Sequence, residues 1–180
     1  MPKAARAFVA MLKAHCLAYE AIHNVYKEKE WPRPKVSLAH FTALYTPCRS
    51  NSVLDSISAK LRSDYVNNSF IDSLMRGWCI GPGMPLARLP VKRSLDFIGI
   101  NYYSRDYVHS NRSGLFGEVC SLTHHKNSCK RNYLNWEIYP RGIYDILMKF
   151  KRYNLPILIT ENGICAKDDN DRIDFIKGHL

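Results

Sequence analysis

The stretch "PILITENGI", residues 156–164, decides the fold. Four apolar or β-branched residues, 157–160, run directly into Glu161, and Asn162 and Gly163 then interrupt the run. A short continuous apolar run bounded by turn-forming residues is typical of a buried strand in a parallel sheet. Such a strand presents Glu161 at its C-terminal end, and Gly163 would let the backbone turn away sharply.

Two more stretches have the composition of strands, "KVSLAHF" at 35–41 and "LDFIGINYY" at 95–103. Helices are predicted where apolar residues recur at helical spacing, namely over about 4–29, 54–76, 140–153 and from 171 onward. The remaining long segment, 104–135, is polar and is expected to be mostly loop, as are the turn-rich residues 77–85 and the segment around Pro47. Strands that alternate with helices in this way indicate an α/β fold with a parallel sheet.

The polar residues at the strand ends are candidates for chemistry. In parallel α/β folds, active groups gather at the C-terminal ends of the strands. One strand here ends in Asn101, Tyr102 and Tyr103, and another ends in Glu161 and Asn162. Spacing alone leaves other interpretations open, because a glutamate can simply begin a loop, tyrosines can pack in the core and an asparagine can cap a turn.

The net charge of +10 raises the possibility of a nucleic-acid partner. The basic residues are scattered, however, and over residues 27–30 they alternate with acidic ones. There is no RNA-binding or helix-turn-helix signature, so a solvated basic surface is favoured and no nucleic acid is expected as a partner.

No apolar run approaches the roughly 20 residues that span a bilayer, so no membrane association is expected. Lys13 interrupts the apolar patch near the start too early for the core of a signal peptide. We therefore expect a cytoplasmic protein.

The chain has six cysteines, which are expected to be reduced and mostly buried. One group of cysteines and histidines is a candidate metal site. Cys120, His124, His125 and Cys129 form C-x3-H-H-x3-C, and these side chain types can bind zinc. Adjacent histidines point in diverging directions and the usual C-x2–4-C pair is missing, so a polar surface loop is favoured over a metal site. No cofactor is expected.

Three sequence motifs in order carry a family resemblance. "DFIGINYYS" at 96–104, "NWEIYPRGIYDIL" at 135–147 and "ITENG" at 159–163 closely resemble glycoside hydrolase family 1. That family contains retaining β-glucosidases, β-galactosidases and phospho-β-glycosidases on a (β/α)8 barrel. The stretches at 13–23 and 35–41 look like its fourth helix and fifth strand. The resemblance therefore implies one incomplete domain over 1–180, a partial TIM barrel with about strands 5 to 7.

The resemblance also implies roles for four residues. Glu161 matches the nucleophile, which would attack the anomeric carbon and form a covalent glycosyl-enzyme. Tyr103 matches the tyrosine that orients this carboxylate, and Asn101 matches an asparagine near the sugar. Trp136 matches an aromatic wall on the aglycone side, although a core tryptophan is the open alternative. Asn135 replaces the glycine usual before that tryptophan, so an altered loop is expected there.

The second carboxylate of a retaining glycosidase is not found. Two carboxyl groups about 5–5.5 Å apart are required, and in this family the acid/base lies in a T-x-N-E-P motif. No N-E-P occurs in the chain. The expectation is therefore an internal piece of a β-glycosidase that acts on β-glycosides or oligosaccharides and carries the nucleophile half, without normal turnover alone. The alternative is an inactive or sugar-binding subunit whose partner chain supplies the missing strands.

Overall fold

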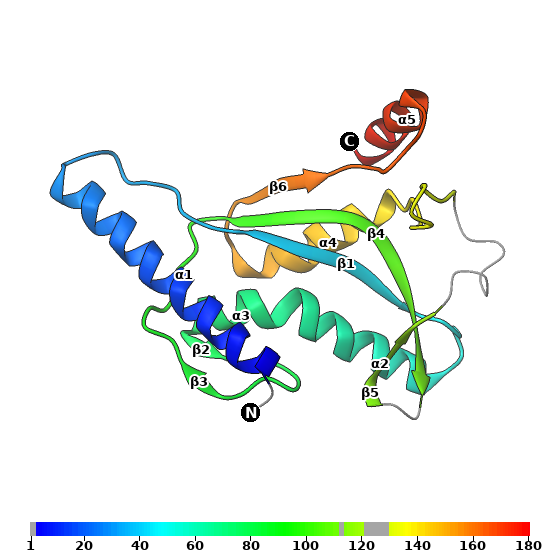
Figure 1. Ribbon diagram of the computed structural model, residues 1–180, viewed down its shortest axis with the longest axis horizontal. Helices are drawn as coiled ribbons and strands as arrows, with labels where there is room; N and C mark the ends of the chain where they lie inside the picture. The colour runs from blue at the N-terminus through cyan, green and yellow to red at the C-terminus, as the bar shows by residue number, and fades with distance from the viewer. Residues whose placement is uncertain (1–2, 112–113, 121–129) are drawn as a thin grey trace.

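The computed structural model describes residues 3–111, 114–120 and 130–180. Its main sheet contains four strands, with β4 pairing with all three others (Figure 1). The strands β1, β4 and β6 are parallel, and β5 runs antiparallel to the C-terminal part of β4. Their bounds are Ala39–Pro47 for β1, Ile98–Asn111 for β4, Gly114–Val119 for β5 and Ile157–Asn162 for β6. The predicted parallel pairing of the three apolar segments is therefore confirmed.

The helices alternate with these strands in the predicted order. They are α1 (Lys3–Glu28), α2 (Val53–Ser63), α3 (Ser69–Arg76), α4 (Arg141–Phe150) and α5 (Asp169–His179). A π-helical turn, Asp64–Asn68, joins α2 to α3, and a 3-10 turn, Lys151–Tyr153, extends α4. A short antiparallel pair, β2 (Trp78–Cys79) and β3 (Ala87–Arg88), lies within the segment expected to be only turns.

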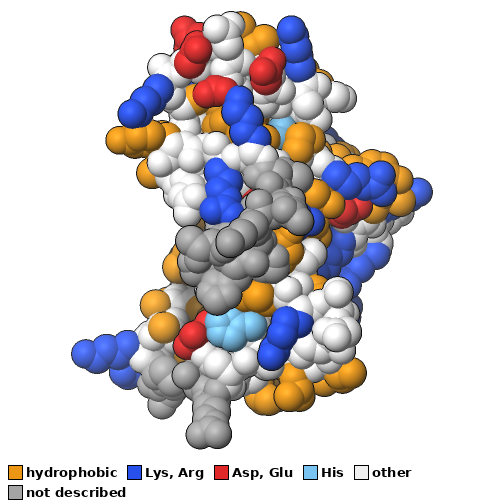
Figure 2. All heavy atoms as spheres, turned by 90° about the vertical axis from the view of Figure 1, so that its right-hand side faces the viewer, with side chains coloured by type: hydrophobic (Ala, Val, Ile, Leu, Met, Phe, Trp, Pro, Cys, Tyr) orange, Lys and Arg blue, Asp and Glu red, His pale blue; other side chains and the backbone are white. Residues whose placement is uncertain are grey.

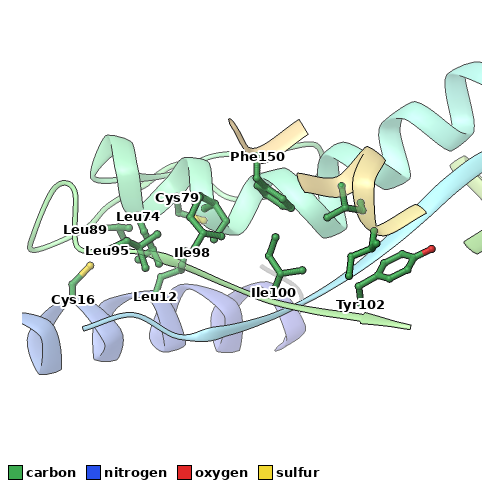
Figure 3. Close-up of a cluster of buried hydrophobic side chains, with 13 residues drawn as sticks. Leu12, Cys16, Leu74, Cys79, Leu89, Leu95, Ile98, Ile100, Tyr102 and Phe150 are labelled. Carbon is green, nitrogen blue, oxygen red and sulfur yellow. The ribbon is translucent and has the colours of Figure 1, made fainter. Parts of the chain in front are cut away.

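The hydrophobic core lies on one side of the sheet, between β4 and the helices. Ile98, Ile100 and Tyr102 alternate along β4 and are fully buried there. Figure 3 shows them facing apolar side chains from α1, α3 and α4 and from the segments around β2 and β3. The cluster also contains Leu12, Cys16, Ile71, Leu74, Cys79, Leu89, Leu95, Ile143, Ile146 and Phe150. One face of the sheet is thereby covered by helices.

Apolar residues on β1 and β6 remain exposed. Phe41 is 50% exposed, Leu158 54% and Ile159 41%. The expectation that residues 157–160 form a buried strand is wrong, because β6 pairs with β4 alone and lies at the edge of the described sheet. The described strands form an open sheet and no closed barrel, as a part of a barrel would.

Two strands are longer than expected and begin later, at Ala39 instead of residue 35 and at Ile98 instead of residue 95. β1 extends to Pro47 and β4 continues to Asn111, where residues 43–47 and 104–111 were expected in loops. Pairing between β1 and β4 continues to the Pro47–Val108 position, so main-chain hydrogen bonds override the polar composition. Pro47 is tolerated because it lies at the end of an edge strand.

Two further expectations need correction. Gly163 does not have a positive φ, and a Cβ there would meet no described atom within 4 Å, so this turn does not require glycine.

Cys48 and Cys120 form a disulfide, whereas all cysteines were expected to be reduced. Cys16 and Cys79 are free and buried as expected, and Cys165 is free but exposed. The suggested ligands His124, His125 and Cys129 lie outside the described residues.

Lysine and arginine side chains are dispersed among apolar and neutral groups on the face shown in Figure 2. Among the described residues, no helix has both the length and the apolar character needed to cross a bilayer.

Candidate active site

A β-bulge in β6 places Glu161 beside Asn101. Ile159 pairs with Ile100, but the next residue of β4, Asn101, pairs with Glu161, so Thr160 is the extra residue of β6. A bulge re-aims the side chains that follow it, and bulges are common beside active sites. Glu161 consequently lies on an exposed edge of the sheet, next to polar side chains of the neighbouring strand.

Tyr103 and Glu161 are hydrogen-bonded across β4 and β6. The phenolic hydroxyl of Tyr103 donates to Oε2 of Glu161. This hydrogen bond, together with partial burial and the negative charge of the carboxylate, raises the pKa of Tyr103 to about 12. The phenol therefore stays protonated and can donate to Glu161 across the neutral pH range, which holds the carboxylate in one orientation.

Asn101 and Asn162 anchor the same end of the sheet. The hydroxyl of Thr160 donates to Oδ1 of Asn101 at 2.5 Å. Asn162 uses its Nδ2 to donate to the carbonyl oxygen of Tyr102 at 2.8 Å. Tyr102 itself is fully buried and donates to the carbonyl of Tyr139 at 2.8 Å, so this tyrosine is a packing residue, unlike its neighbour.

Trp136 lies at the surface beside Tyr103, with ring centroids 6.1 Å apart. It is 44% exposed, so the interpretation as a core tryptophan is wrong. The preceding residue, Asn135, has φ +63°, a left-handed conformation that glycine adopts freely and asparagine tolerates. Asn132 accepts from the backbone N–H of Trp136 at 2.9 Å through Oδ1. The backbone conformation at Asn135 is therefore one that a glycine would also adopt without strain.

A buried ion pair involves the residue that follows this tryptophan and was not predicted from the sequence. Both guanidinium nitrogens Nε and Nη2 of Arg105 donate to the carboxylate of Glu137, at 2.7 and 2.6 Å. The Glu137 side chain is fully buried and that of Arg105 is 14% exposed. The Arg105 guanidinium also lies 3.8 Å from the ring centroid of Tyr139. Because Glu137 follows Trp136 directly, this pair fixes the backbone that presents the indole.

A shallow pocket of about 180 Å³ opens between Tyr103 and Trp136. Asp106 also lines it, and burial raises the pKa of its carboxyl group. Ala43 of β1 stands opposite both Tyr103 and Ser104, which makes a second bulge in the sheet, this time in β4. The bulge explains why Asp106 contributes to the same pocket as Tyr103, a relationship that simple alternation along a strand would not predict. The full lining is Phe41, Ala43, Tyr103, Ser104, Asp106 and Trp136.

The structure thus brings together all four residues singled out from the sequence. Glu161 contacts Tyr103, which neighbours Trp136, and Asn101 pairs with Glu161 in the sheet. The part of the chain that the structure describes shows one group suited to a metal ion, Cys48 with His109 and Cys120, and it includes none of these four.

Known β-glycosidases are similar to this chain in sequence and in fold. A β-galactosidase of Sulfolobus acidocaldarius is 30% identical over 94% of this chain, and one of Saccharolobus solfataricus is 28% identical over 97%. Among solved structures, a β-glycosidase from Pyrococcus horikoshii is similar with a TM-score of 0.81 and 33% identity over 96% of the chain. A family 1 β-glucosidase from Thermotoga maritima, 24% identical, shares the fold with a TM-score of 0.73 over 95% of the chain.

The matched share of those proteins is small. This chain spans 34% and 35% of the two β-galactosidases, and 38% and 41% of the two structures. The family model described as glycosyl hydrolase family 1 matches residues 86–180, more than half of the chain. This match includes β4, β6 and all four candidate site residues, and the chain belongs to glycosyl hydrolase family 1.

Proposed function

We propose that this chain carries the nucleophile half of a retaining β-glycosidase, with Glu161 as the nucleophile. The observation that carries the proposal is the hydrogen bond from Tyr103 to Glu161 at the C-terminal end of parallel strands. A carboxylate fixed by one donor and otherwise open to solvent can attack an anomeric carbon and form a glycosyl-enzyme. β-Glucosides and β-galactosides are the proposed substrates, in line with the names of the relatives.

Two neighbouring residues have supporting roles in this proposal. Trp136 presents an exposed indole face on which the apolar face of a sugar or aglycone can stack. Asn101, held by Thr160, offers its amide to a sugar hydroxyl or to the carboxylate beside it. Both lie at the rim that corresponds to strands 5 to 7 of a (β/α)8 barrel, where active sites of this fold are located.

We infer from the missing T-x-N-E-P motif that the acid/base carboxylate comes from outside these 180 residues. Asp106 lines the pocket with Tyr103, but it lies on the same strand as this tyrosine and no T-x-N-E-P motif accompanies it. The exposed apolar residues Phe41, Leu158 and Ile159 mark the surface that further strands of a barrel would cover. We propose that those strands, on the same polypeptide or on a complementing chain, complete the sheet and the site.

The first test uses a substrate that needs no acid catalysis. A dinitrophenyl β-glucoside or β-galactoside has a leaving group that departs unprotonated, so glycosylation depends on the nucleophile alone. We expect slow release of at most one dinitrophenolate per chain and a hexosyl adduct on Glu161, located by peptide mass spectrometry. Glu161→Gln abolishes the adduct, and the matched exposed control Glu20→Gln retains it. An adduct that persists in Glu161→Gln contradicts the proposal.

A chimera tests the same role with a complete barrel. The matched segment of the Pyrococcus horikoshii β-glycosidase is replaced by this chain, so that the relative supplies the missing strands. We expect hydrolysis of a β-glucoside by the chimera and loss of it in Glu161→Gln. The isolated chain is expected not to turn over unactivated cellobiose, because general acid–base assistance is worth about 10²–10⁴-fold. A folded chimera that is inactive would count against the proposal.

A second candidate is a non-catalytic subunit that binds sugar only with a partner. It is favoured by the exposed apolar side chains of β6, which lack a neighbour on one side of the described sheet. If this candidate is right, no hexosyl adduct forms on Glu161. Calorimetric titration with glucose and cellobiose then detects binding only when the partner chain is present.

A further inference from the structure

The sheet holds two cysteines on either side of one strand, away from Glu161. Cys48 directly follows β1, and its backbone N–H donates to the carbonyl of Val108 at 2.8 Å. Cys120 directly follows β5, and its backbone N–H donates to the carbonyl of Tyr107 at 2.7 Å. Both acceptors are consecutive residues of β4, the central strand. Main-chain hydrogen bonds therefore fix the positions of both cysteines independently of any bond between their sulfurs.

A histidine of the same strand completes the cluster. His109 follows Val108, and its Nδ1 lies 3.2 Å from Sγ of Cys120. The two sulfurs and an imidazole nitrogen of His109 all lie within 4.8 Å of one another. Cys120 is buried and the other two side chains are partly buried. Two thiolates and one imidazole are the ligand types that zinc prefers in proteins.

An acidic residue lies near the imidazole of His109, on the side away from Cys120. Oε2 of Glu118 lies 3.9 Å from Nε2 of His109, the nitrogen opposite to the one that faces Cys120. Histidines that bind metals usually donate their other ring N–H to a carboxylate or carbonyl, which fixes the tautomer and the ring orientation. At 3.9 Å the Glu118 carboxylate is too far to accept this N–H, so it must approach by about 1 Å to complete the arrangement expected at a zinc site.

We propose that the reduced form of Cys48 and Cys120, together with His109, binds one zinc-type divalent cation. A dithiol reductant supplies two electrons and two protons to the disulfide and is itself oxidised, which leaves two thiols. Cation binding then displaces the two thiol protons as both sulfurs become thiolate ligands. The disulfide and the metal site are alternative states of the same pair of cysteines.

The required movement is small. Zinc–sulfur bonds of about 2.3 Å and zinc–nitrogen bonds of about 2.0–2.1 Å place tetrahedral ligand atoms roughly 3.5–3.8 Å apart. Nδ1 of His109 and Sγ of Cys120 are already 3.2 Å apart, and breaking the disulfide lets the sulfurs separate. Three protein ligands leave a fourth position for water.

This site is separate from the candidate active site. His109 is six residues beyond Tyr103 on β4, or roughly 20 Å at about 3.3 Å per residue. The cation site thus goes beyond the proposed glycosidase function, and either proposal can fail without the other.

The test is a titration of the 180-residue chain with Co²⁺ in the absence of oxygen. A phosphine reductant keeps the cysteines reduced. We expect one Co²⁺ per chain with a sulfur-to-cobalt charge-transfer band, which one equivalent of Zn²⁺ removes. Cys48→Ser and Cys120→Ser should each weaken that band and lower affinity at least about tenfold, and His109→Ala should lower affinity similarly. Glu118→Gln should lower affinity about tenfold, the usual effect of losing a carboxylate behind a histidine ligand. The control Cys165→Ser, which removes an exposed free thiol, should bind like the unsubstituted chain.

Three outcomes overturn the proposal, two from the cobalt titration and one from cysteine reactivity. One is a reduced chain that shows no sulfur-to-cobalt band. Another is binding that survives in Cys48→Ser and His109→Ala but is lost in His124→Ala or Cys129→Ser, which would assign the cation to different ligands. If a variant does not fold, the unsubstituted chain still decides the matter. Zn²⁺ should protect Cys48 and Cys120 from iodoacetamide while Cys165 stays reactive, and equal reactivity of all three with and without Zn²⁺ refutes the site.

Discussion

Tyr103 donates its hydroxyl to the carboxylate of Glu161 across two adjacent parallel strands, although 58 residues separate them in the chain. The bulge at Thr160 brings Glu161 level with Asn101, and Tyr103 lies on the same face of β4 two residues further on. The intervening residues include α4 and the turn that presents Trp136, so the crossover between the two strands supplies the aromatic surface beside the carboxylate.

Loss of the tyrosine hydroxyl should slow glycosylation of Glu161. A hydrogen bond to a charged group is worth about 1.5–3 kcal/mol, so Tyr103→Phe should reduce the rate of dinitrophenolate release roughly 10- to 100-fold. Tyr144→Phe, an exposed tyrosine on α4, is the matched control and should leave the rate unchanged. Equal rates for the two variants would show that the hydroxyl does not support the carboxylate.

The same hydrogen bond should be visible in an alkaline titration. The difference in tyrosinate absorbance between the chain and Tyr103→Phe should report a pKa of about 12 for Tyr103. A raised pKa means that the bond stabilises the fold fully below the unfolded pKa of about 10, and this contribution is lost as the pH rises through 12. Glu161→Gln removes the carboxylate charge and should bring the pKa of Tyr103 down toward 10. A transition near 10 in the unsubstituted chain would contradict the bond.

The buried ion pair should matter more for stability than a surface pair. Glu137→Gln leaves the Arg105 guanidinium without its charged partner in a nearly buried position, so we expect a loss of about 3–5 kcal/mol in the free energy of unfolding. Asp145→Asn breaks an exposed pair with Arg141 on α4 and should cost under about 0.5 kcal/mol. Urea unfolding curves provide both values, and similar losses in the two variants would refute the distinction.

Alanine should destabilise the chain at one glycine and have little effect at another. A Cβ at Gly142 would lie 1.9 Å from Oη of Tyr102, which cannot swing away because it is fully buried and bonded to the carbonyl of Tyr139. Gly142→Ala should therefore cost about 1–3 kcal/mol, despite the better helix propensity of alanine. Gly163→Ala meets open space and should change stability by less than about 0.5 kcal/mol. Thermal unfolding measured by circular dichroism tests both, and a larger loss at Gly163 would be inconsistent with the structure.

Low pH should weaken the hydrogen bonds and the ion pair that Asp55 makes in the segment after β1. Asp55 is fully buried and accepts from the Arg49 guanidinium and from the backbone and hydroxyl of Ser110, and these bonds hold its pKa far below 3.8. A lowered pKa stabilises the fold above the unfolded value of about 3.9, and this contribution is lost as the pH falls below it.

Asp55→Asn should accordingly destabilise the chain by about 2 kcal/mol at pH 7 and by less at pH 2 to 3. Denaturant midpoints at several pH values check this expectation. A difference that stays constant with pH would show that the charge of Asp55 is not responsible. Asp64→Asn, which removes a more exposed carboxylate paired with Lys60, is the control and should have the smaller effect.

The sequence alone determined the alternation of helices and parallel strands, and it pointed to Glu161, Tyr103, Asn101 and Trp136. The alternation followed from apolar runs and helical spacing, whereas the four residues were singled out by motifs that resemble glycoside hydrolase family 1. The strand ends converge because parallel strands carry their C-terminal residues to one edge of the sheet, a rule that needs no coordinates.

Other features depended on tertiary pairing. The two bulges, the extension of β4 to Asn111, the pairing of Arg105 with Glu137 and the meeting of Cys48 with Cys120 join segments that are remote in sequence. Pairing partners are chosen by the whole sheet, and a one-residue shift in register changes which side chains face each other. The exposure of β6 also has a tertiary cause, because an apolar strand is buried only where a second layer or a neighbouring strand covers it. Local composition therefore indicated where the three parallel strands lie, while the sheet decided how far they extend and which of their side chains meet.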